Sequence, residues 1–238
     1  MKKRAIITGA NGQLGSAFVE ALTEKGYFVY AVDLNIEKIK SSENVQPVKL
    51  DITDETAVHN FFSSVQSLNV LINNAGIGVF TPFEDRTAAE FKKVMEVNLL
   101  GAFLMSQSSV KIMKNSDGGK IVNIASIYGS TSSDERIYGD SGRNNSEVYS
   151  ATKAGLINMT QYMATHFGKY NIQTNSISPG GIYNQQSEDF VKNYEYKTPM
   201  GRMGKDQDLL SALFYLVSED TQYTNGQDIA VDGGFLAW

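Results

Sequence analysis

Short apolar runs alternate with longer amphipathic segments along the whole chain. The short runs are rich in β-branched residues and predict strands at residues 5–7, 28–32, 48–50, 70–72, 121–124, 172–177 and 229–231. Between them, apolar residues recur about every 3.6 positions and predict helices at residues 14–25, 53–67, 87–114, 148–167 and 206–218. This alternation predicts an α/β fold: a doubly wound, mostly parallel seven-stranded sheet with helices on both faces.

Two connections are too long for this alternation. Residues 128–147 are rich in Ser, Gly, Asn and Asp, and residues 180–205 also fit neither period. Connections of this length inside a compact domain are usually functional or mobile. Because the chain shows no linker or repeat, we expect residues 1–238 to form one domain. An insertion at about 130–148 and a loop at about 180–205 would build its functional site.

Composition and charge exclude several classes of protein. The chain has no cysteine and two histidines, which rules out a disulfide scaffold and leaves little for a metal site, so we expect no metal. A net charge of −5 without a basic stripe argues against binding to nucleic acid or to an anionic membrane. The apolar run at residues 5–7 is too short for a signal peptide, and no apolar stretch approaches the roughly 18 residues of a membrane span. We therefore expect a soluble cytoplasmic protein.

A glycine-rich segment follows the first predicted strand. Gly9, Gly12 and Gly15 are spaced for a tight turn, a close backbone approach and packing of the next helix on the strand. Such a turn aims amide N–H groups at a pyrophosphate, although an ordinary strand-to-helix turn is the alternative. The candidate cofactor-binding residues of this segment are Gly9, Asn11, Gly12, Gln13, Leu14 and Gly15.

Two aspartates mark the ends of the next two strands. Asp33 lies where a carboxylate can accept hydrogen bonds from both hydroxyls of a ribose, although a solvated strand-end aspartate is the alternative. Asp51, followed by Ile52, could meet an adenine amino group. Together with Thr53 and Asp54, Asp51 is equally suited to capping the next helix, so both interpretations stay open.

A pair of residues on the helix predicted from residue 148 carries candidate chemistry. Because residues four apart share a helix face, the Lys153 ammonium is expected near the Tyr149 phenol and favours its ionised form. A free tyrosine has a pKa of about 10, so a lowered pKa would make Tyr149 a candidate acid/base at neutral pH. Ser126, after the fifth strand, would hydrogen-bond a substrate oxygen on which charge develops. Alone, a Tyr and a Lys at this spacing are typical of an ordinary surface helix.

The order of these motifs resembles the short-chain dehydrogenase/reductase family over essentially the whole chain. The motifs are Asn73-Asn74-Ala75-Gly76, Asn98, Ser126, Tyr149 with Lys153, Pro179-Gly180 and Val231-Asp232-Gly233-Gly234. The resemblance implies a Rossmann domain that binds NAD or NADP. It also implies a catalytic set of Tyr149, Lys153, Ser126 and Asn98, with Asn98 holding a water that links Lys153 to solvent. Further cofactor contacts would come from Asn74, Ala75, Gly76, Tyr149, Lys153, Pro179, Gly180 and Ile182.

Two positions depart from the family pattern. Gln13 stands where most members carry Gly, and the glycine spacing resembles the extended branch that acts on nucleotide sugars. The chain length and the Asn-Asn-Ala-Gly element are typical of the main branch instead. The Thr that often follows Pro-Gly and contacts the nicotinamide is absent, and Asn184 is a candidate to replace it.

The segment between Ser126 and Tyr149 is longer than is usual in the family. Its side chains are almost all hydrogen-bonding, and Arg136 and Arg143 could receive a phosphate or a carboxylate. This composition suits a polyhydroxylated or anionic substrate, whereas a solvated surface insertion is the alternative. The insertion and the residues after Pro179 also resemble a subgroup of bacterial flagellin-modification and nonulosonic-acid sugar pathways.

These inferences favour an oxidoreductase that interconverts a secondary alcohol and a ketone on a sugar-like small molecule. NAD is expected rather than NADP, because Asp33 would repel a 2′-phosphate and residues 34–37 supply no arginine. The alternatives are a nucleotide-sugar epimerase or dehydratase, and a regulator that senses the nucleotide without chemistry. The resemblance also implies a homotetramer or homodimer built on the helices that begin near Thr87 and Val148. Their apolar residues include Phe91, Val94, Leu99, Phe103, Leu156, Met159 and Met163.

Overall fold

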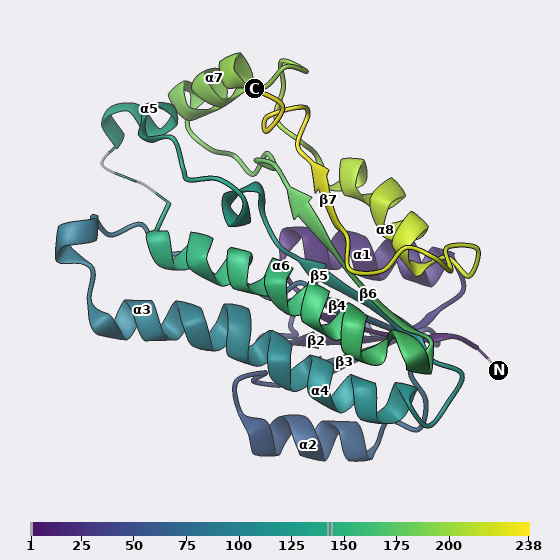
Figure 1. Cartoon of the computed structure of the whole chain (residues 1–238). Helices are drawn as coiled ribbons and strands as arrows, with labels where there is room; N and C mark the ends of the chain where they lie inside the picture. Colours follow the sequence, from purple (N-terminus) through teal and green to yellow (C-terminus); the bar gives the residue numbers. More distant parts are fainter. Residues whose placement is uncertain (1, 142, 144) are drawn as a thin grey trace.

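Parallel strands form the central sheet of the computed structural model, which describes residues 2–141, 143 and 145–238 (Figure 1). The strands are β1 (Arg4–Thr8), β2 (Phe28–Asp33), β3 (Val45–Lys49), β4 (Val70–Asn73), β5 (Gly119–Ile124), β6 (Ile172–Pro179) and β7 (Asp228–Val231). Their order is β3-β2-β1-β4-β5-β6-β7, and every neighbouring pair is parallel. The predicted doubly wound sheet is confirmed. Because the order of the strands reverses at β1, a crevice is expected at the carboxyl ends of β1 and β4.

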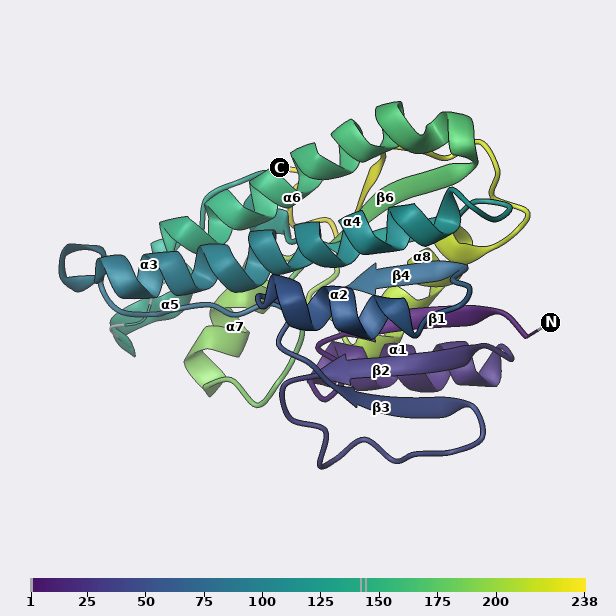
Figure 2. The same cartoon turned by 90° about the horizontal axis from the view of Figure 1, so that it is seen from below.

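Helices cover both faces of the sheet. They are α1 (Gln13–Glu24), α2 (Glu55–Ser63), α3 (Ala88–Met95), α4 (Ala102–Met113), α5 (Glu135–Tyr138), α6 (Glu147–Phe167), α7 (Glu188–Lys197) and α8 (Leu210–Val217). Figures 1 and 2 show α2, α4 and α6 on one face, with α1 and α8 on the other. Among the described residues, no helix combines the length and the apolar character needed to cross a membrane.

Alternate residues of each strand enter opposite cores. Ile7 belongs to the core that contains Phe18 of α1, whereas its neighbour Ile6 belongs to the core that contains Phe62 of α2 and Met105 of α4. Both isoleucines are completely buried. Burial on both faces explains why the strands read as continuous apolar runs rather than as alternating ones.

The helix predicted at residues 87–114 is divided in the structure. A π-helical turn at Glu96–Gly101 separates α3 from α4. At Gly101, a Cβ atom would stand 2.6 Å from the Cδ1 atom of Ile52, so the glycine lets this turn approach the segment after β3 closely. The turn places Asn98 inside the protein, where it is 1% exposed.

The two long connections contain structure that the sequence pattern did not predict. α5 lies in the first of them and α7 in the second. Together with the C-terminal residues they enclose a third apolar cluster, which contains Ile137, Tyr194 and Phe235. The rings of Tyr194 and Phe235 stack with their centroids 5.0 Å apart. Ile137 and its neighbours in this cluster are therefore packed against the body of the protein, whereas more than half of the described residues of the insertion are exposed, so the alternative of a solvated surface insertion stays open for them.

Three residues expected at a subunit contact lie in the interior. Val94, Leu156 and Met163 are at most 5% exposed. They cannot contact a second chain, because their side chains already pack inside this one. Phe91 and Phe103 of the same set remain exposed at 42% and 44%.

Candidate active site

Three adjoining cavities lie at the carboxyl ends of the strands. The first, of about 410 Å³, extends from the glycine-rich segment to Asp33 and Asp51. The second, of about 270 Å³, is bounded by Lys153 and Tyr149, and the third, of about 630 Å³, is lined by the insertion and the loop at 180–205. The first and second share Leu14, Asn74, Gly76 and Ile77. The second and third share Gly78, Ser126, Tyr149 and Gly180.

The glycine-rich segment forms a tight turn under the first cavity. Gly9 has a φ of +66°, and a Cβ atom there would stand 2.9 Å from the Cα atom of Ala75. At Gly15, a Cβ atom would stand 2.0 Å from the carbonyl oxygen of Gly9. Gly12 caps α1 without a side-chain hydrogen bond, and the first turn of α1 has no acidic residue. The amide N–H groups at this helix end are therefore suited to an anion such as a pyrophosphate.

The ends of β1 and β4 are joined by hydrogen bonds between Thr8 and Asn74. The Nδ2 atom of Asn74 donates to the carbonyl oxygens of Thr8 (3.0 Å) and Gly9 (3.2 Å). In return, the hydroxyl of Thr8 accepts from the backbone N–H groups of Asn74 and Ala75, each at 3.0 Å. These bonds fix the floor of the first cavity at the point where the strand order reverses.

Asp33 lines the first cavity and also supports the glycine-rich segment. Its Oδ2 atom accepts from the backbone N–H of Asn11 (3.0 Å), and its Oδ1 atom accepts from that of Asn35 (3.0 Å). Asn11 was expected at the cofactor, but it does not line the cavity. Its Oδ1 atom is buried and has no hydrogen-bond partner among the described residues. Since Asn11 does not line the cavity, its contact with a cofactor stays a prediction, whereas the Asp33 carboxylate offers acceptor oxygens that fit the hydroxyl donors of a ribose.

The structure separates the two roles that the sequence left open for Asp51. Asp54 caps α2 by accepting a hydrogen bond from the backbone N–H of Ala57 (3.0 Å). The Oδ1 atom of Asp51 accepts instead from the hydroxyl (2.7 Å) and the N–H (2.9 Å) of Thr53, which lowers the pKa of Asp51. Asp51 and Ile52 both line the first cavity, and a contact of Asp51 with an adenine stays a prediction.

Tyr149, Lys153 and Ser126 meet around the second cavity. Ser146 caps α6 by accepting from the backbone N–H of Tyr149 (3.2 Å), which starts the helix just before the tyrosine. The Nζ atom of Lys153 lies 5.5 Å from the centroid of the Tyr149 ring and donates to the carbonyl oxygen of Ile124 (2.7 Å). The sequence prediction that these residues are neighbours is correct.

The electrostatics of this pair differ from the expectation. Burial raises the pKa of Tyr149, with the neighbouring Ser126 side chain acting in the opposite direction. Burial also lowers the pKa of Lys153 to about 8. The predicted lowering of the Tyr149 pKa by Lys153 is therefore wrong for this structure, because desolvation of the phenolate dominates. At neutral pH, Tyr149 is a neutral phenol that can donate a proton.

Comparison with known proteins identifies the family of this chain. A family model described as enoyl-(acyl carrier protein) reductase matches residues 9–236. A 2-dehydro-3-deoxy-D-gluconate 5-dehydrogenase from Formosa agariphila is 33% identical over 99% of this chain and 93% of its own length. The chain belongs to the short-chain dehydrogenase/reductase family.

Solved structures of short-chain dehydrogenases/reductases have the same fold. One from Leptospira borgpetersenii serovar Hardjo-bovis with bound NAD⁺ is 43% identical, covers 99% of this chain and 93% of its own, and has a TM-score of 0.92. A mutant 4-hydroxyisoleucine dehydrogenase complexed with NADH and succinate is 32% identical, covers 99% of each chain, and has a TM-score of 0.90. Both of these related structures contain a nicotinamide cofactor, so a cofactor of this class is expected for the family of this chain.

Most of the predicted residues of this short-chain dehydrogenase/reductase line the first two cavities. Those in the first are Gly9, Gly12, Gln13, Leu14, Gly15, Asp33, Asp51, Ile52, Asn74, Ala75 and Gly76. Those in the second include Ser126, Tyr149, Lys153, Pro179, Gly180 and Ile182. The sequence missed Leu34, Thr53, Ile77 and Gly78, whose place depends on the turns that follow the strands, and Val97, which lies in the π-helical turn. No motif marks these residues in the sequence.

Asn98 is buried next to the site and forms hydrogen bonds with residues on two sides of it. Its Nδ2 atom donates to the carbonyl oxygen of Ile77 (2.9 Å) and to the hydroxyl of Thr152 (3.1 Å), and its Oδ1 atom accepts from the N–H of Ile77 (2.8 Å). Both hydrogens of the amide are thus used within the protein. The side chain positions the segment after β4, and its holding of a water toward Lys153 stays a prediction.

Gln13 has a structural role that the family pattern does not suggest. Its Nε2 atom donates to the carbonyl oxygen of Tyr183 (2.8 Å) and to the Oδ1 atom of Asp206 (2.7 Å). These bonds join the start of α1 to Tyr183 of the loop at 180–205 and to Asp206, which directly follows that loop. The side chain that replaces the usual glycine therefore ties the first cavity to a wall of the third.

Two candidates from the sequence lie away from the expected places. Asn184 lines the third cavity, and it is Ile182 that lines the second. The substitution of Asn184 for the family Thr is therefore not supported. Arg136 is paired with Asp134 at 2.8 Å, has a side chain 89% exposed and does not line the third cavity, whereas Arg143 does.

Gly15→Ala is expected to weaken binding of the cofactor. A Cβ atom at 2.0 Å from the Gly9 carbonyl oxygen forces the start of α1 away from β1, and the amide groups of the turn move with it. We expect the Kd for NADH to rise at least about tenfold, equivalent to about 1.4 kcal/mol, in a fluorescence titration. Gly155→Ala is the control, because its Cβ atom would make an ordinary contact at 3.4 Å with Leu99. Unchanged affinity of Gly15→Ala would refute this role of the turn.

Proposed function

We propose that the protein is an NAD-dependent oxidoreductase that interconverts a secondary alcohol and a ketone on a polar, sugar-like small molecule. The observation that carries the proposal is that Ser126 and Tyr149 line both the second and the third cavity. A nicotinamide in the second cavity and a substrate in the third would meet at these two hydroxyls. The cofactor supplies or accepts the hydride, and the chain supplies the groups that handle the proton.

The first and second cavities divide the cofactor between them. The amide groups at the start of α1 would bind the pyrophosphate, and Asp33 would bind the ribose hydroxyls. Pro179, Gly180 and Ile182 would hold the nicotinamide end, because they line the second cavity beside Lys153. This division supports the proposed positions of the cofactor residues.

The chemistry follows from the protonation of Tyr149. In the reducing direction the neutral phenol donates its proton to the carbonyl oxygen as the carbon accepts hydride, and Ser126 hydrogen-bonds the same oxygen. In the oxidising direction Tyr149 must first lose its proton to solvent, and the resulting phenolate then takes the proton of the alcohol. The Lys153 ammonium, which Ile124 holds in place, stabilises the phenolate once it forms.

The lining of the third cavity favours a polar substrate. It includes the uncharged polar residues Ser141, Asn145, Asn184, Gln185, Gln186 and Ser187. Burial raises the pKa of Tyr128, Tyr138 and Tyr194, that of Tyr194 to about 12, so these residues present neutral hydroxyl groups. The relative from Formosa agariphila is named for a sugar acid, and one from Listeria innocua, 30% identical, is named an NAD-dependent glycerol dehydrogenase. These names support a hydroxylated substrate here.

Turnover of NAD(H) with a panel of polyols, sugar acids and keto sugars tests the proposed function. Net oxidation or reduction of the cofactor, one equivalent for each product, is expected. A nucleotide-sugar epimerase would regenerate its cofactor and show no net change, and a regulator would bind NADH without turnover. The resemblance of the insertion to the flagellin-modification and nonulosonic-acid subgroup stays a prediction that keto-sugar members of the panel would test.

We also propose that the protein is a homodimer or homotetramer in the cytoplasm. Phe91, Leu100 and Phe103 near the π-helical turn and Tyr162 of α6 are each more than 40% exposed, on the helices expected to meet a second copy. Light scattering is expected to show a dimer or tetramer at micromolar concentration. The double variant Phe91→Asp with Phe103→Asp should lower the mass to that of the monomer, because paired apolar surfaces would then carry charge. Tyr196→Ser, on α7 and 91% exposed, is the control, and a monomeric wild type would contradict the proposal.

A further inference from the structure

We propose that Arg143 and Asn145 form a carboxylate-binding subsite in the third cavity, so that the substrate is a hydroxy acid or its oxo acid. The inference rests on the proposed function and deepens it by naming the group that the insertion recognises. It depends on two hydrogen-bond donors that lie on the same stretch of the insertion and line the same cavity.

Arg143 provides the positive charge. It is the one charged side chain among the described residues that line the third cavity. Within residues 2–141, 143 and 145–238, its guanidinium has no carboxylate partner and donates no hydrogen bond. The Cζ atom lies 4.2 Å from the centroid of the Phe80 ring, which supports the guanidinium by a cation–π contact and leaves its N–H groups available.

Asn145 provides a second donor. Its Nδ2 atom is buried and has no hydrogen-bond partner among the described residues. A buried donor without a partner is unfavourable, so native proteins usually supply one, from the chain, from water or from a ligand. No Asp or Glu belongs to the described lining of the third cavity, so an acceptor for Arg143 is expected to come from the substrate, and Asn145, which lines this cavity and a neighbouring one, is the second donor that the same group would engage.

The subsite lies within reach of the reacting groups. A Cβ atom placed on Gly78 would stand 3.8 Å from the Cδ2 atom of Tyr149 and 3.9 Å from the Cζ atom of Phe80. The Phe80 ring, on which the Arg143 guanidinium lies, and the Tyr149 ring are therefore both close to Gly78. A chain of a few carbons can place a carboxylate on Arg143 and a secondary alcohol on Tyr149.

A carboxylate matches this subsite better than a phosphate does. A carboxylate carries one negative charge and pairs with a guanidinium through two parallel hydrogen bonds. A phosphate monoester carries about −1.5 to −2 at neutral pH and is usually bound by several cations or amide groups. The described lining of the third cavity offers one cation, in a protein whose net charge is −5.

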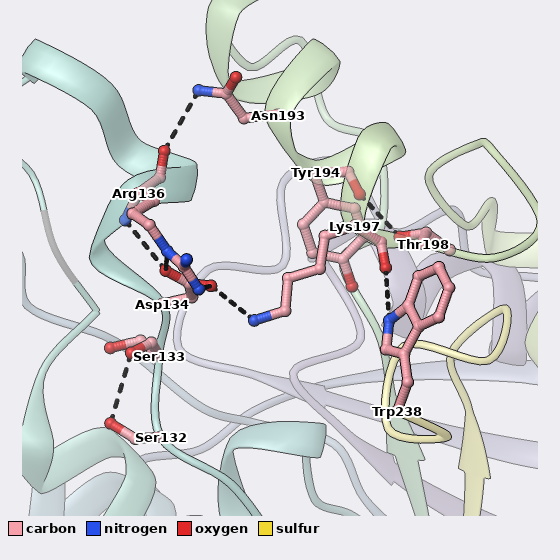
Figure 3. Close-up of polar contacts among 9 residues, drawn as sticks. All are labelled: Ser132, Ser133, Asp134, Arg136, Asn193, Tyr194, Lys197, Thr198 and Trp238. Carbon is pink, nitrogen blue, oxygen red and sulfur yellow. Dashed lines mark hydrogen bonds and ion pairs between the residues drawn. The ribbon is translucent and has the colours of Figure 1, made fainter.

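The insertion is held in place from the other side by α7. Figure 3 shows Asp134 accepting hydrogen bonds from Arg136, at 2.8 and 2.9 Å, and from the Nζ atom of Lys197 at 2.6 Å. The carbonyl oxygen of Lys197 in turn accepts from the indole N–H of Trp238 (3.1 Å), and Asn193 donates to the carbonyl oxygen of Arg136 (3.3 Å). Arg136 is thus occupied by Asp134, which makes it the matched control for Arg143.

Two measurements test the subsite, one with turnover and one without. The first compares kcat/KM for D-gluconate with that for D-glucitol, which has the same carbon chain without the carboxylate. We expect the acid to be preferred at least about tenfold, and Arg143→Ala to abolish the preference, chiefly through KM, because one charge-assisted pair is lost. Asn145→Ala should reduce the preference by a smaller factor. Arg136→Ala should leave it as in the wild type.

The second measurement is the binding of succinate to the NADH complex by calorimetry. Binding is expected for the wild type and Arg136→Ala, and a Kd at least about tenfold higher is expected for Arg143→Ala. Absence of succinate binding, or binding that Arg143→Ala does not change, would overturn the subsite. So would a higher kcat/KM for glycerol 3-phosphate than for glycerate, which would point to a phosphate. Binding that depends on Arg143 in a protein that turns over no substrate would refute the proposed function and leave the subsite standing.

Discussion

Tyr149→Phe is expected to lower kcat by about 10²- to 10⁴-fold, the usual contribution of a general acid or base. The variant loses the proton that the phenol donates to the substrate oxygen and keeps the ring that fills the wall between the second and third cavities. Affinity for NADH should change less than about twofold, since the cofactor loses one contact near the reacting carbon. Steady-state kinetics and a fluorescence titration measure the two quantities separately.

Tyr162→Phe is the matched control for this variant. Tyr162 is on the same helix, but it is 57% exposed and its ring stacks on His166 with the centroids 3.9 Å apart. Its kcat should equal that of the wild type. If Tyr149→Phe retained more than a few per cent of wild-type kcat, Tyr149 would not be the acid/base.

The second large effect expected is a preference for NAD over NADP of about 10²-fold or more in kcat/KM. The Asp33 carboxylate lines the first cavity, held there by the N–H groups of Asn11 and Asn35. It can accept hydrogen bonds from an unmodified ribose, whereas a 2′-phosphate beside it would meet a like charge at a cost of several kcal/mol. Neither arginine nor lysine belongs to the described lining of this cavity, so nothing there neutralises the phosphate.

Removing the charge of Asp33 should relax this preference. Asp33→Asn keeps an acceptor oxygen for the N–H of Asn11 and should bring the ratio of the two cofactors to within about tenfold, chiefly by improving NADP. Asp33→Ala should relax the ratio as well, but with weaker NAD binding, because the glycine-rich segment loses that acceptor. Glu37→Gln, an exposed change of charge outside the cavity, is the control. If the wild type had the same kcat/KM with NAD and with NADP, Asp33 would not be the residue that distinguishes the ribose hydroxyl from the 2′-phosphate.

Much of the fold follows from local pattern. The strands are buried on both faces, so each reads as a short β-branched run, and the order of runs and amphipathic segments predicts the parallel sheet. The third strand begins at Val45, earlier than predicted, and includes Pro47. Proline lacks the N–H that a central strand needs, so sequence alone argues against a strand here, but β3 is at the edge of the sheet.

The features that sequence did not predict depend on contacts between distant segments. The π-helical turn at Glu96–Gly101 places Asn98 against the backbone of Ile77, which follows another strand. α7 is ordered against the insertion through Lys197 and Asp134, which are 63 positions apart. The same folding brings Arg143 onto Phe80 and leaves Arg136 outside the cavity, although the two arginines look alike in the sequence.

Lys153 shows why the protonation of the site was harder to predict than its residues. The spacing of Tyr149 and Lys153 is visible in the sequence and predicts that they are neighbours. Their burial is not visible, and burial is the main cause of both pKa shifts: the pKa of Tyr149 rises and that of Lys153 falls to about 8. A prediction from the nearby charge of Lys153 alone therefore gave the wrong direction for the pKa shift of Tyr149.

Transfer of deuterium from NADH labelled at the nicotinamide C4 position to a ketone substrate tests the central claim most directly. With the wild type, we predict that deuterium appears at the carbon that bears the new hydroxyl group, from one face of the nicotinamide only. With Tyr149→Phe, the same transfer should occur about 10²- to 10⁴-fold more slowly. Product without deuterium, NADH binding without any transfer, or transfer at an unchanged rate in Tyr149→Phe would contradict the account.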